Sequence, residues 1–241
     1  MLARVRTSAL AGVDAFSVDV EVLVRPGEAK FTIIGLGDNA VRESRDRVLS
    51  AIRNSGFNVP EQILVNLAPA EQKKEGSSFD LPIAVGILIA SGQLASTELG
   101  GLSLHGELAL DGRVKGIHGT VALAAHAAQT GVPALVVPLQ NIREARLVPD
   151  LKVVGVESLL DVSAYLRGEY DEKMQGKENN DSLAEGMAEP GTSLNLSDVW
   201  GQESAKRAML IAAAGGHNLL MIGPPGCGKS MLAQRFPSIL P

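Results

Sequence analysis

The sequence is poor in cysteine, in aromatic residues and in long apolar runs. Its single cysteine, Cys227, excludes an internal disulfide and fits the reducing cytoplasm. Aromatic residues make up 3% of the chain, so the core must be built from aliphatic side chains. The longest apolar run, residues 81–90, is about half as long as a membrane-spanning helix requires, and the N-terminus lacks the apolar centre of a signal peptide. We therefore expect a cytoplasmic protein without a membrane segment.

Negative charge is concentrated in one segment of the chain. Residues 168–196 contain two basic and seven acidic residues, a net charge of −5 that equals the net charge of the whole chain. The segment has few large apolar residues and no sustained periodicity, so burial cannot offset the entropy of ordering it. It predicts an acidic flexible linker between a first domain, residues 1–167, and the start of a second, residues 197–241. The other residues form no strong basic patch that would indicate nucleic-acid binding.

The first domain alternates strand and helix patterns. Residues 16–24 alternate apolar and polar side chains, as a half-buried strand does, and residues 30–37 are expected to pair with them as a hairpin. Two helices are expected, at residues 38–56 and 80–91, the first with Asp38 and the second with Asp80 at its N-terminus. Further strands are expected at residues 62–69, 134–139 and 151–156, further helices at residues 120–131 and 158–168, and a hairpin turn at Asp111-Gly112. This order predicts an α/β domain with a mixed sheet.

The second segment contains the phosphate-binding pattern G-x-x-x-x-G-K-[ST]. An apolar stretch at residues 217–222 predicts the strand before it, and residues 230–236 predict the helix after it. Glycines let the backbone turn its N–H groups towards phosphate oxygens, Lys229 reaches the β- and γ-phosphates, and the Ser230 hydroxyl is a magnesium ligand. We therefore expect ATP and magnesium to bind here. The expected loop residues are Gly223, Pro224, Pro225, Gly226, Cys227, Gly228, Lys229, Ser230 and Met231.

The rest of an ATPase site does not follow the loop. Eleven residues come after Ser230. They hold neither the acid that completes magnesium binding nor the residue that positions the attacking water. We expect this chain to be a fragment that binds nucleotide poorly and turns it over hardly at all. Cys227 lies at a variable loop position, and no histidine and acid accompany it as a catalytic thiol would require.

Three stretches resemble one protein family. "DVWGQESAKRAMLIAAAGGHNLLMIGPPGCGKS" is similar to the start of the AAA+ module in magnesium-chelatase-like ATPases of the YifB/ComM family. "IIGLGDNAVRESRDRVLSAIRNSGF" and "EGSSFDLPIAVGILIAS" resemble the first domain of the same family. The resemblance implies that Val199, Trp200, Gly201 and Gln202 contact the adenine. It also implies a homo-hexameric, ATP-driven DNA motor of the branch-migration type in competence and recombination, a role that composition does not indicate.

The first domain also resembles the proteolytic domain of Lon, which uses a Ser–Lys dyad. "EGSSFD" places Ser78 at the position of the serine, and "GRVKGIHGTVALAAH" places Val121 at the position of the lysine. Valine cannot act as the base that a serine nucleophile needs, and Lys115 lies six residues too early. We therefore expect a non-proteolytic domain in which Ser78 caps the helix near Asp80. The alternative function is a non-catalytic scaffold or partner-binding domain, and whether the chain is an enzyme stays open.

The remaining charged residues favour no second site. Arg42 and Asp46, like Glu43 and Arg47, lie four residues apart and can pair along a helix, so this face is expected to be solvated. His105, His118, His126 and His217 lack metal-ligand spacing and are interpreted as structural or surface residues.

Overall fold

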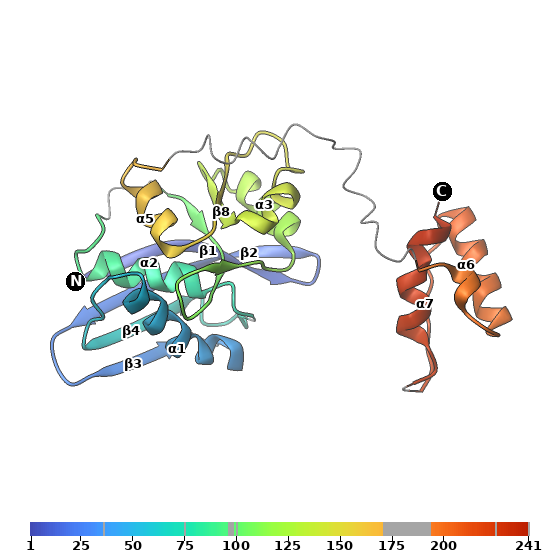
Figure 1. Ribbon diagram of the computed structural model, residues 1–241, viewed down its shortest axis with the longest axis horizontal. Helices are drawn as coiled ribbons and strands as arrows, with labels where there is room; N and C mark the ends of the chain where they lie inside the picture. Colours follow the sequence, from blue (N-terminus) through green and yellow to red (C-terminus); the bar gives the residue numbers. More distant parts are fainter. Residues whose placement is uncertain are drawn as a thin grey trace. The chain divides into compact units, whose positions relative to one another are not determined.

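The computed structural model describes residues 1–35, 37–74, 76–95, 99, 101–170, 194–224 and 226–240. The chain divides into two compact units, Met1–Glu178 and Asn179–Pro241 (Figure 1). Most of the segment expected to be a linker, residues 171–193, lies outside the described residues. In the part of the chain that the structure describes, no helix combines the length and the apolar character needed to cross a bilayer.

The first unit is built on a seven-stranded mixed sheet with the strand order β3-β4-β2-β1-β5-β8-β9. Its strands are β1 (Leu2–Ala11), β2 (Asp14–Arg25), β3 (Lys30–Ile34), β4 (Gln62–Ala68), β5 (Ser103–Leu104), β8 (Leu135–Pro138) and β9 (Val153–Val156). β2 pairs antiparallel with β1 and β4, and the other neighbours pair in parallel. A separate hairpin joins β6 (Glu107–Leu108) to β7 (Val114–Lys115), with the expected turn at Asp111-Gly112.

Helices cover both faces of this sheet. They are α1 (Asn39–Asn54), α2 (Asp80–Ala90), α3 (Thr120–Gln129), α4 (Ile142–Ala145) and α5 (Leu159–Leu166). The main core joins α1, α2 and α5 to one face, and a smaller cluster joins α3 and α4 to β8 on the other. Every residue of α2 is buried, and Gly86 lets this helix approach the sheet, because a Cβ there would lie 2.6 Å from a methyl group of Val22. The α/β class and the mixed sheet predicted from the sequence are therefore confirmed.

Two local predictions for the first unit are wrong, and one strand was missed. β3 pairs with β4 rather than forming a hairpin with β2, whose hairpin partner is β1, a strand that the sequence patterns did not reveal. Asp80 does not cap α2, since Phe79 holds the N-cap position without a side-chain hydrogen bond. By contrast, the Asp38 carboxylate accepts a hydrogen bond from the Val41 N–H at 2.9 Å, as expected of the cap of α1.

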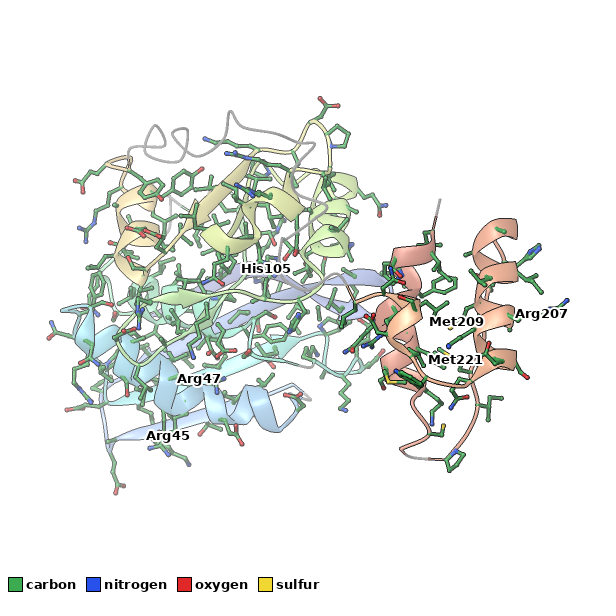
Figure 2. The ribbon with its side chains drawn as sticks, turned by 45° about the vertical axis from the view of Figure 1, so that its right-hand side comes forward. Arg45, Arg47, His105, Arg207, Met209 and Met221 are labelled. Carbon is green, nitrogen blue, oxygen red and sulfur yellow. The ribbon has the colours of Figure 1, made fainter. Side chains whose placement is uncertain are left out.

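A buried histidine lies at the centre of the first unit (Figure 2). The ring of His105 is fully buried and lies within hydrogen-bond distance of the hydroxyls of Thr7, Ser8 and Ser103. Thr7 donates its only hydroxyl proton to the carbonyl of Leu104 at 2.7 Å, so Nδ1 of His105 must donate to Thr7 and Nε2 must accept. Burial, together with the nearby His126, lowers the pKa of His105 to about 3. His105 is thus a neutral, structural histidine.

Candidate nucleotide-binding site

The second unit is organised around a small hydrophobic cluster. A 3₁₀ turn at Leu196–Asp198 starts it, followed by α6 (Glu203–Gly215), the phosphate-binding loop and α7 (Lys229–Arg235). Four buried side chains from these parts meet in the cluster: Leu196, Val199, Met209 and Leu232. The cluster holds the turn, α6 and α7 together, and so fixes the two ends of the loop that joins the helices.

The loop has the backbone conformation that its glycines predict. Gly226 and Gly228 have positive φ values of 81° and 87°, which side chains with a Cβ rarely adopt. A Cβ on Gly223 would lie 2.9 Å from Sγ of Cys227, so a side chain there would have to displace this thiol. Pro225, which belongs to the expected loop, lies outside the described residues. The described part is therefore a tight turn that ends where α7 begins, at Lys229.

The side chain of Lys229 lies across this turn. Its ammonium group donates to the carbonyl oxygens of Gly223 at 2.7 Å and Pro224 at 2.8 Å, and approaches Sγ of Cys227 at 3.5 Å. The hydroxyl of Ser230 is exposed, and among the described residues it has no hydrogen-bond partner. These are the two side chains that the sequence pattern assigns to a phosphate and to magnesium. Met231 follows on α7, 39% exposed.

The segment expected to contact the adenine is joined to the loop. The amide of Gln202 donates to the carbonyl of Cys227 at 3.3 Å. Gln202 and Gly201 both have left-handed φ values, of 58° and 71°, and this double turn places the Gln202 side chain over the loop. Val199 is 2% exposed and Trp200 is 94% exposed, so the side chain of Val199 packs into the cluster while Trp200 is open to solvent. The structure therefore brings together the two groups of residues that the sequence singled out.

The strand expected at residues 217–222 is not formed. No described residue pairs with this stretch, and Leu220 and Ile222 are 82% and 88% exposed. A strand needs a neighbour for its N–H and C=O groups, and an apolar pattern alone cannot supply one. This prediction is wrong for the chain as it stands.

The serine expected at the Lon-like site has no base. Among the described residues the hydroxyl of Ser78 has no hydrogen-bond partner. The backbone carbonyl of Ser78 accepts a hydrogen bond from the N–H of Gly106 at 3.0 Å. Ser78 therefore does not cap α2, contrary to the prediction. Val121 is 43% exposed at the start of α3, and Lys115 pairs with Glu107 at 3.4 Å. The arrangement does not assemble a Ser–Lys dyad.

A network of charged residues that the sequence patterns missed lies at the start of α2. Arg47 binds the buried carboxylate of Asp80 through two nitrogens, at 2.6 and 3.1 Å, rather than pairing with Glu43 along α1. Burial raises the pKa of Asp80 to about 6, although Arg47 opposes the rise. Burial would also raise the pKa of Glu107, but hydrogen bonds from Ser77 and Lys115 outweigh it and hold that pKa below its usual value. No local signal connects residues that are 33 positions apart.

A lysine that the sequence patterns overlooked is fully buried in the loop before α2. Lys74 donates to the carbonyls of Gly35 and Pro69, and burial lowers its pKa. Its own carbonyl accepts from the N–H of Asp38 at 3.0 Å. Lys74 therefore ties the loop before α2 to the loop before α1. In the part of the chain that is described, no three histidine, cysteine, aspartate or glutamate side chains gather as a metal site.

Comparison with known proteins agrees with both halves of this architecture. The family model "Subunit ChlI of Mg-chelatase" matches residues 20–141, and the model "Magnesium chelatase, subunit ChlI" matches residues 195–241. The chain is 44% identical over its full length to the competence protein ComM of Haemophilus influenzae and also 44% identical to YifB of Salmonella typhimurium, and it covers 47% and 46% of them. It thus spans about half the length of these relatives. The Lon protease of Halothermothrix orenii is 27% identical over 169 residues, which are 64% of this chain and 21% of that protein. The chain therefore belongs to the magnesium-chelatase subunit ChlI family, as a member of its YifB/ComM type with a Lon-like first domain.

Proposed function

We propose that this chain carries the nucleotide-binding part of an ATP-driven motor. The observation that carries the proposal is the position of the Lys229 ammonium, which is held against the carbonyls of Gly223 and Pro224 inside a turn of positive-φ glycines. A cation in a cradle of backbone groups is the arrangement that phosphate-binding loops use. The family membership supports ATP and magnesium as the ligands.

Each residue has a distinct part in holding the nucleotide. The backbone from Gly223 to Gly228 would surround the phosphates, and Lys229 would exchange its carbonyl partners for phosphate oxygens. The hydroxyl of Ser230 would hold magnesium, while the turn at Gly201 and Gln202 would face the base. ATP, when bound, supplies the phosphoanhydride whose hydrolysis drives the motor, and magnesium neutralises the phosphate charge.

The wider role proposed for the whole protein is DNA remodelling. A homo-hexameric, cytoplasmic motor that moves DNA branches during competence and recombination would use the energy of ATP in this way. Support comes from the family resemblance and from the relative named as a competence protein. The chain covers about half of that relative, so the remaining parts of such a motor would lie in further residues.

The single tryptophan provides a direct test of nucleotide binding. Trp200 is exposed beside the expected adenine segment, so magnesium-ATP should change its fluorescence with a dissociation constant of roughly 0.1–1 mM, corresponding to about 4–5 kcal/mol. Lys229→Ala should weaken this binding at least about tenfold, since a charge-assisted bond is lost. Lys115→Ala, in the first unit, is the matched control and should bind like the unchanged chain. Equal affinity of Lys229→Ala and the unchanged chain would overturn the proposal.

A second candidate function is a non-catalytic scaffold formed by the first unit. It is favoured by the hydroxyl of Ser78, which has no hydrogen-bond partner in the described part of the chain, by valine at position 121 and by a core that belongs entirely to this unit. This function predicts that partner binding or self-association of the chain is unchanged by Lys229→Ala. It also predicts that Ser78 stays unlabelled by a fluorophosphonate probe, detected by mass spectrometry. Labelling of Ser78 would instead support a peptidase.

A further inference from the structure

A polar cavity of about 290 Å³ opens on the first unit. Strands β1 and β2, the start of β5 and helix α3 form its walls. It is lined by Arg6, Thr7, Ser17, Asp19, Ser103, His126, Ala127, Thr130 and Val132. Its volume is close to the lower end of the range of about 300–1,000 Å³ that is usual for small-molecule sites. The cavity therefore suits a ligand of only a few non-hydrogen atoms.

Two neighbouring cross-strand pairs behave differently at this cavity. Arg4 stands opposite Glu21, and Arg6 stands opposite Asp19, in the same antiparallel ladder. The first pair forms an ion pair at 2.8 Å. Among the residues that the structure describes, the side chains of Arg6 and Asp19 form no hydrogen bond and no ion pair. The ladder thus contains a closed pair, Arg4 and Glu21, whose side chains form an ion pair. Two residues along the same face it contains an open pair, Arg6 and Asp19, whose side chains do not.

The geometry of Arg6 and Asp19 explains why this pair stays open. The carboxylate of Asp19 is one methylene shorter than that of Glu21. The guanidinium of Arg6 turns towards the β5 side, where its Nη1 lies 3.8 Å from the place that a Cβ on Gly101 would take. The Arg6 guanidinium and the Asp19 carboxylate therefore line the same cavity without forming an ion pair with each other.

The other polar groups of the cavity are already satisfied. His126 and Ser17 are joined by a hydrogen bond of 2.9 Å, and the hydroxyl of Thr130 donates to the carbonyl of His126 at 2.8 Å. Ser103 lies 2.9 Å from the buried ring of His105. The charged groups of the cavity that are left without a partner among the described residues are therefore the guanidinium of Arg6 and the carboxylate of Asp19.

We propose that this cavity binds a small zwitterion, of the α-amino acid class, with its carboxylate on Arg6 and its ammonium on Asp19. An arginine fork suits a carboxylate, and an unpaired carboxylate suits an ammonium group. A ligand that carries only an anion would meet the like charge of Asp19, and one that carries only a cation would meet Arg6. An α-amino acid carries both charges on one carbon, and the volume limits its side chain to a small one. The assignment goes beyond the proposed nucleotide site and does not depend on it.

The test is a nuclear magnetic resonance titration of the whole chain with four probes. L-alanine is the zwitterion, sodium acetate and methylammonium chloride each carry one of its charges, and inorganic phosphate tests a general anion site. Probes added up to about 20 mM detect dissociation constants in the millimolar range. L-alanine should give saturable shifts of amides in β1, β2 and α3, and the other three probes should bind at least about tenfold more weakly, because each leaves one charge unpaired.

Three single-residue variants make the test specific. Asp19→Glu keeps the charge but lengthens the side chain, so that the pair can close as Arg4 and Glu21 do, and L-alanine binding should be lost. Arg6→Gln should also lose it. Arg4→Gln, on the same strand and face, is the matched control and should bind L-alanine as the unchanged chain does.

Three results would overturn the proposal. They are the absence of L-alanine binding at the highest concentration, equal binding of acetate or phosphate, and undiminished binding by Asp19→Glu. Far-ultraviolet circular dichroism and thermal melting of each variant verify its fold, and both changed side chains lie at the surface of the sheet. A variant that fails to fold is replaced by Asp19→Asn, which must likewise lose L-alanine binding.

Discussion

The two units differ in how completely they bury their apolar side chains. In the first unit α2 is buried along its whole length between the sheet, α1 and the β6–β7 hairpin. In the second unit four buried residues form the core, while Trp200, Leu220 and Ile222 are at least 82% exposed. Stability scales with buried apolar area, so the first unit is the more stable one. The loop proposed to bind nucleotide thus belongs to the unit with the smaller buried core.

The largest expected effect is acid destabilisation of the first unit through His105. Its folded pKa, about 3, lies below the ordinary value of 6.5. As the pH falls below 6.5 the unfolded chain takes up this proton and the folded chain does not, so up to roughly 5 kcal/mol of stability is lost by pH 3. Urea unfolding of the whole chain, followed by far-ultraviolet circular dichroism between pH 8 and pH 4, measures this loss.

A histidine variant separates this effect from that of Asp80. Burial raises the pKa of Asp80 in the folded chain to about 6, above its ordinary value of 3.8. On acidification the folded chain therefore takes up this proton before the unfolded chain does. The free energy of unfolding thus falls by up to about 3 kcal/mol as the pH rises from 3.8 to 6. His105→Gln retains the Asp80 effect and should lose stability less steeply than the unchanged chain on acidification. His217→Gln, an exposed histidine of the second unit, is the control. An identical pH dependence of His105→Gln and the unchanged chain would contradict the buried neutral histidine.

A pair of leucine variants sharpens the comparison between the units. Leu88 is fully buried in α2, whereas Leu220 is 82% exposed. Leu88→Ala should lower the free energy of unfolding by about 3 kcal/mol through the lost burial and the remaining cavity, and Leu220→Ala should change it by less than about 0.5 kcal/mol. Urea unfolding measures both values. A cost at Leu220 comparable to that at Leu88 would show that residues 217–222 are packed in solution.

A smaller effect is expected at the start of α1. Asp38 accepts hydrogen bonds from the N–H groups of Val41 and Gly76 at 2.9 and 3.2 Å. Asp38→Ala should cost about 1 kcal/mol, the usual value of an N-cap, whereas Asp38→Asn should keep most of the bonding. Thermal melting of the two variants compares them. Equal melting temperatures for the alanine and asparagine variants would indicate that the cap contributes nothing.

Local chemistry decided which features could be predicted from the sequence. The glycine turn before Lys229, the Asp38 cap and the Asp111-Gly112 turn each depend on a few adjacent residues, and the structure contains these three local features. The partner of β3 could not be deduced, because its parallel pairing with β4 bridges about thirty residues and leaves no trace in local periodicity. The alternation of Ala3 and Val5 with Arg4 and Arg6 would have revealed β1, since it follows the two-residue period of a strand.

In the candidate sites, too, local patterns could be predicted from the sequence and contacts between distant segments could not. Lys229, Ser230 and the glycines were identified by their spacing, and Gln202 by resemblance to the family. Arg47 and Asp80, the buried Lys74 and the open pair of Arg6 and Asp19 were not identified, because each depends on contacts between distant segments. The failed strand at residues 217–222 has the opposite cause, since its local pattern is right but the neighbouring strand that it requires is not among the described residues.

Hydrogen exchange with and without magnesium-ATP, read by mass spectrometry on the whole chain, tests most directly whether the second unit alone binds nucleotide. Binding should slow exchange at the turn around Gly201 and in the loop from Gly223 to Met231, since bound phosphates would engage these backbone N–H groups. Exchange in β1, α2 and the rest of the first unit should be unchanged, and Lys229→Ala should abolish the protection. Protection that survives in Lys229→Ala, or that appears in the first unit instead, would contradict the account.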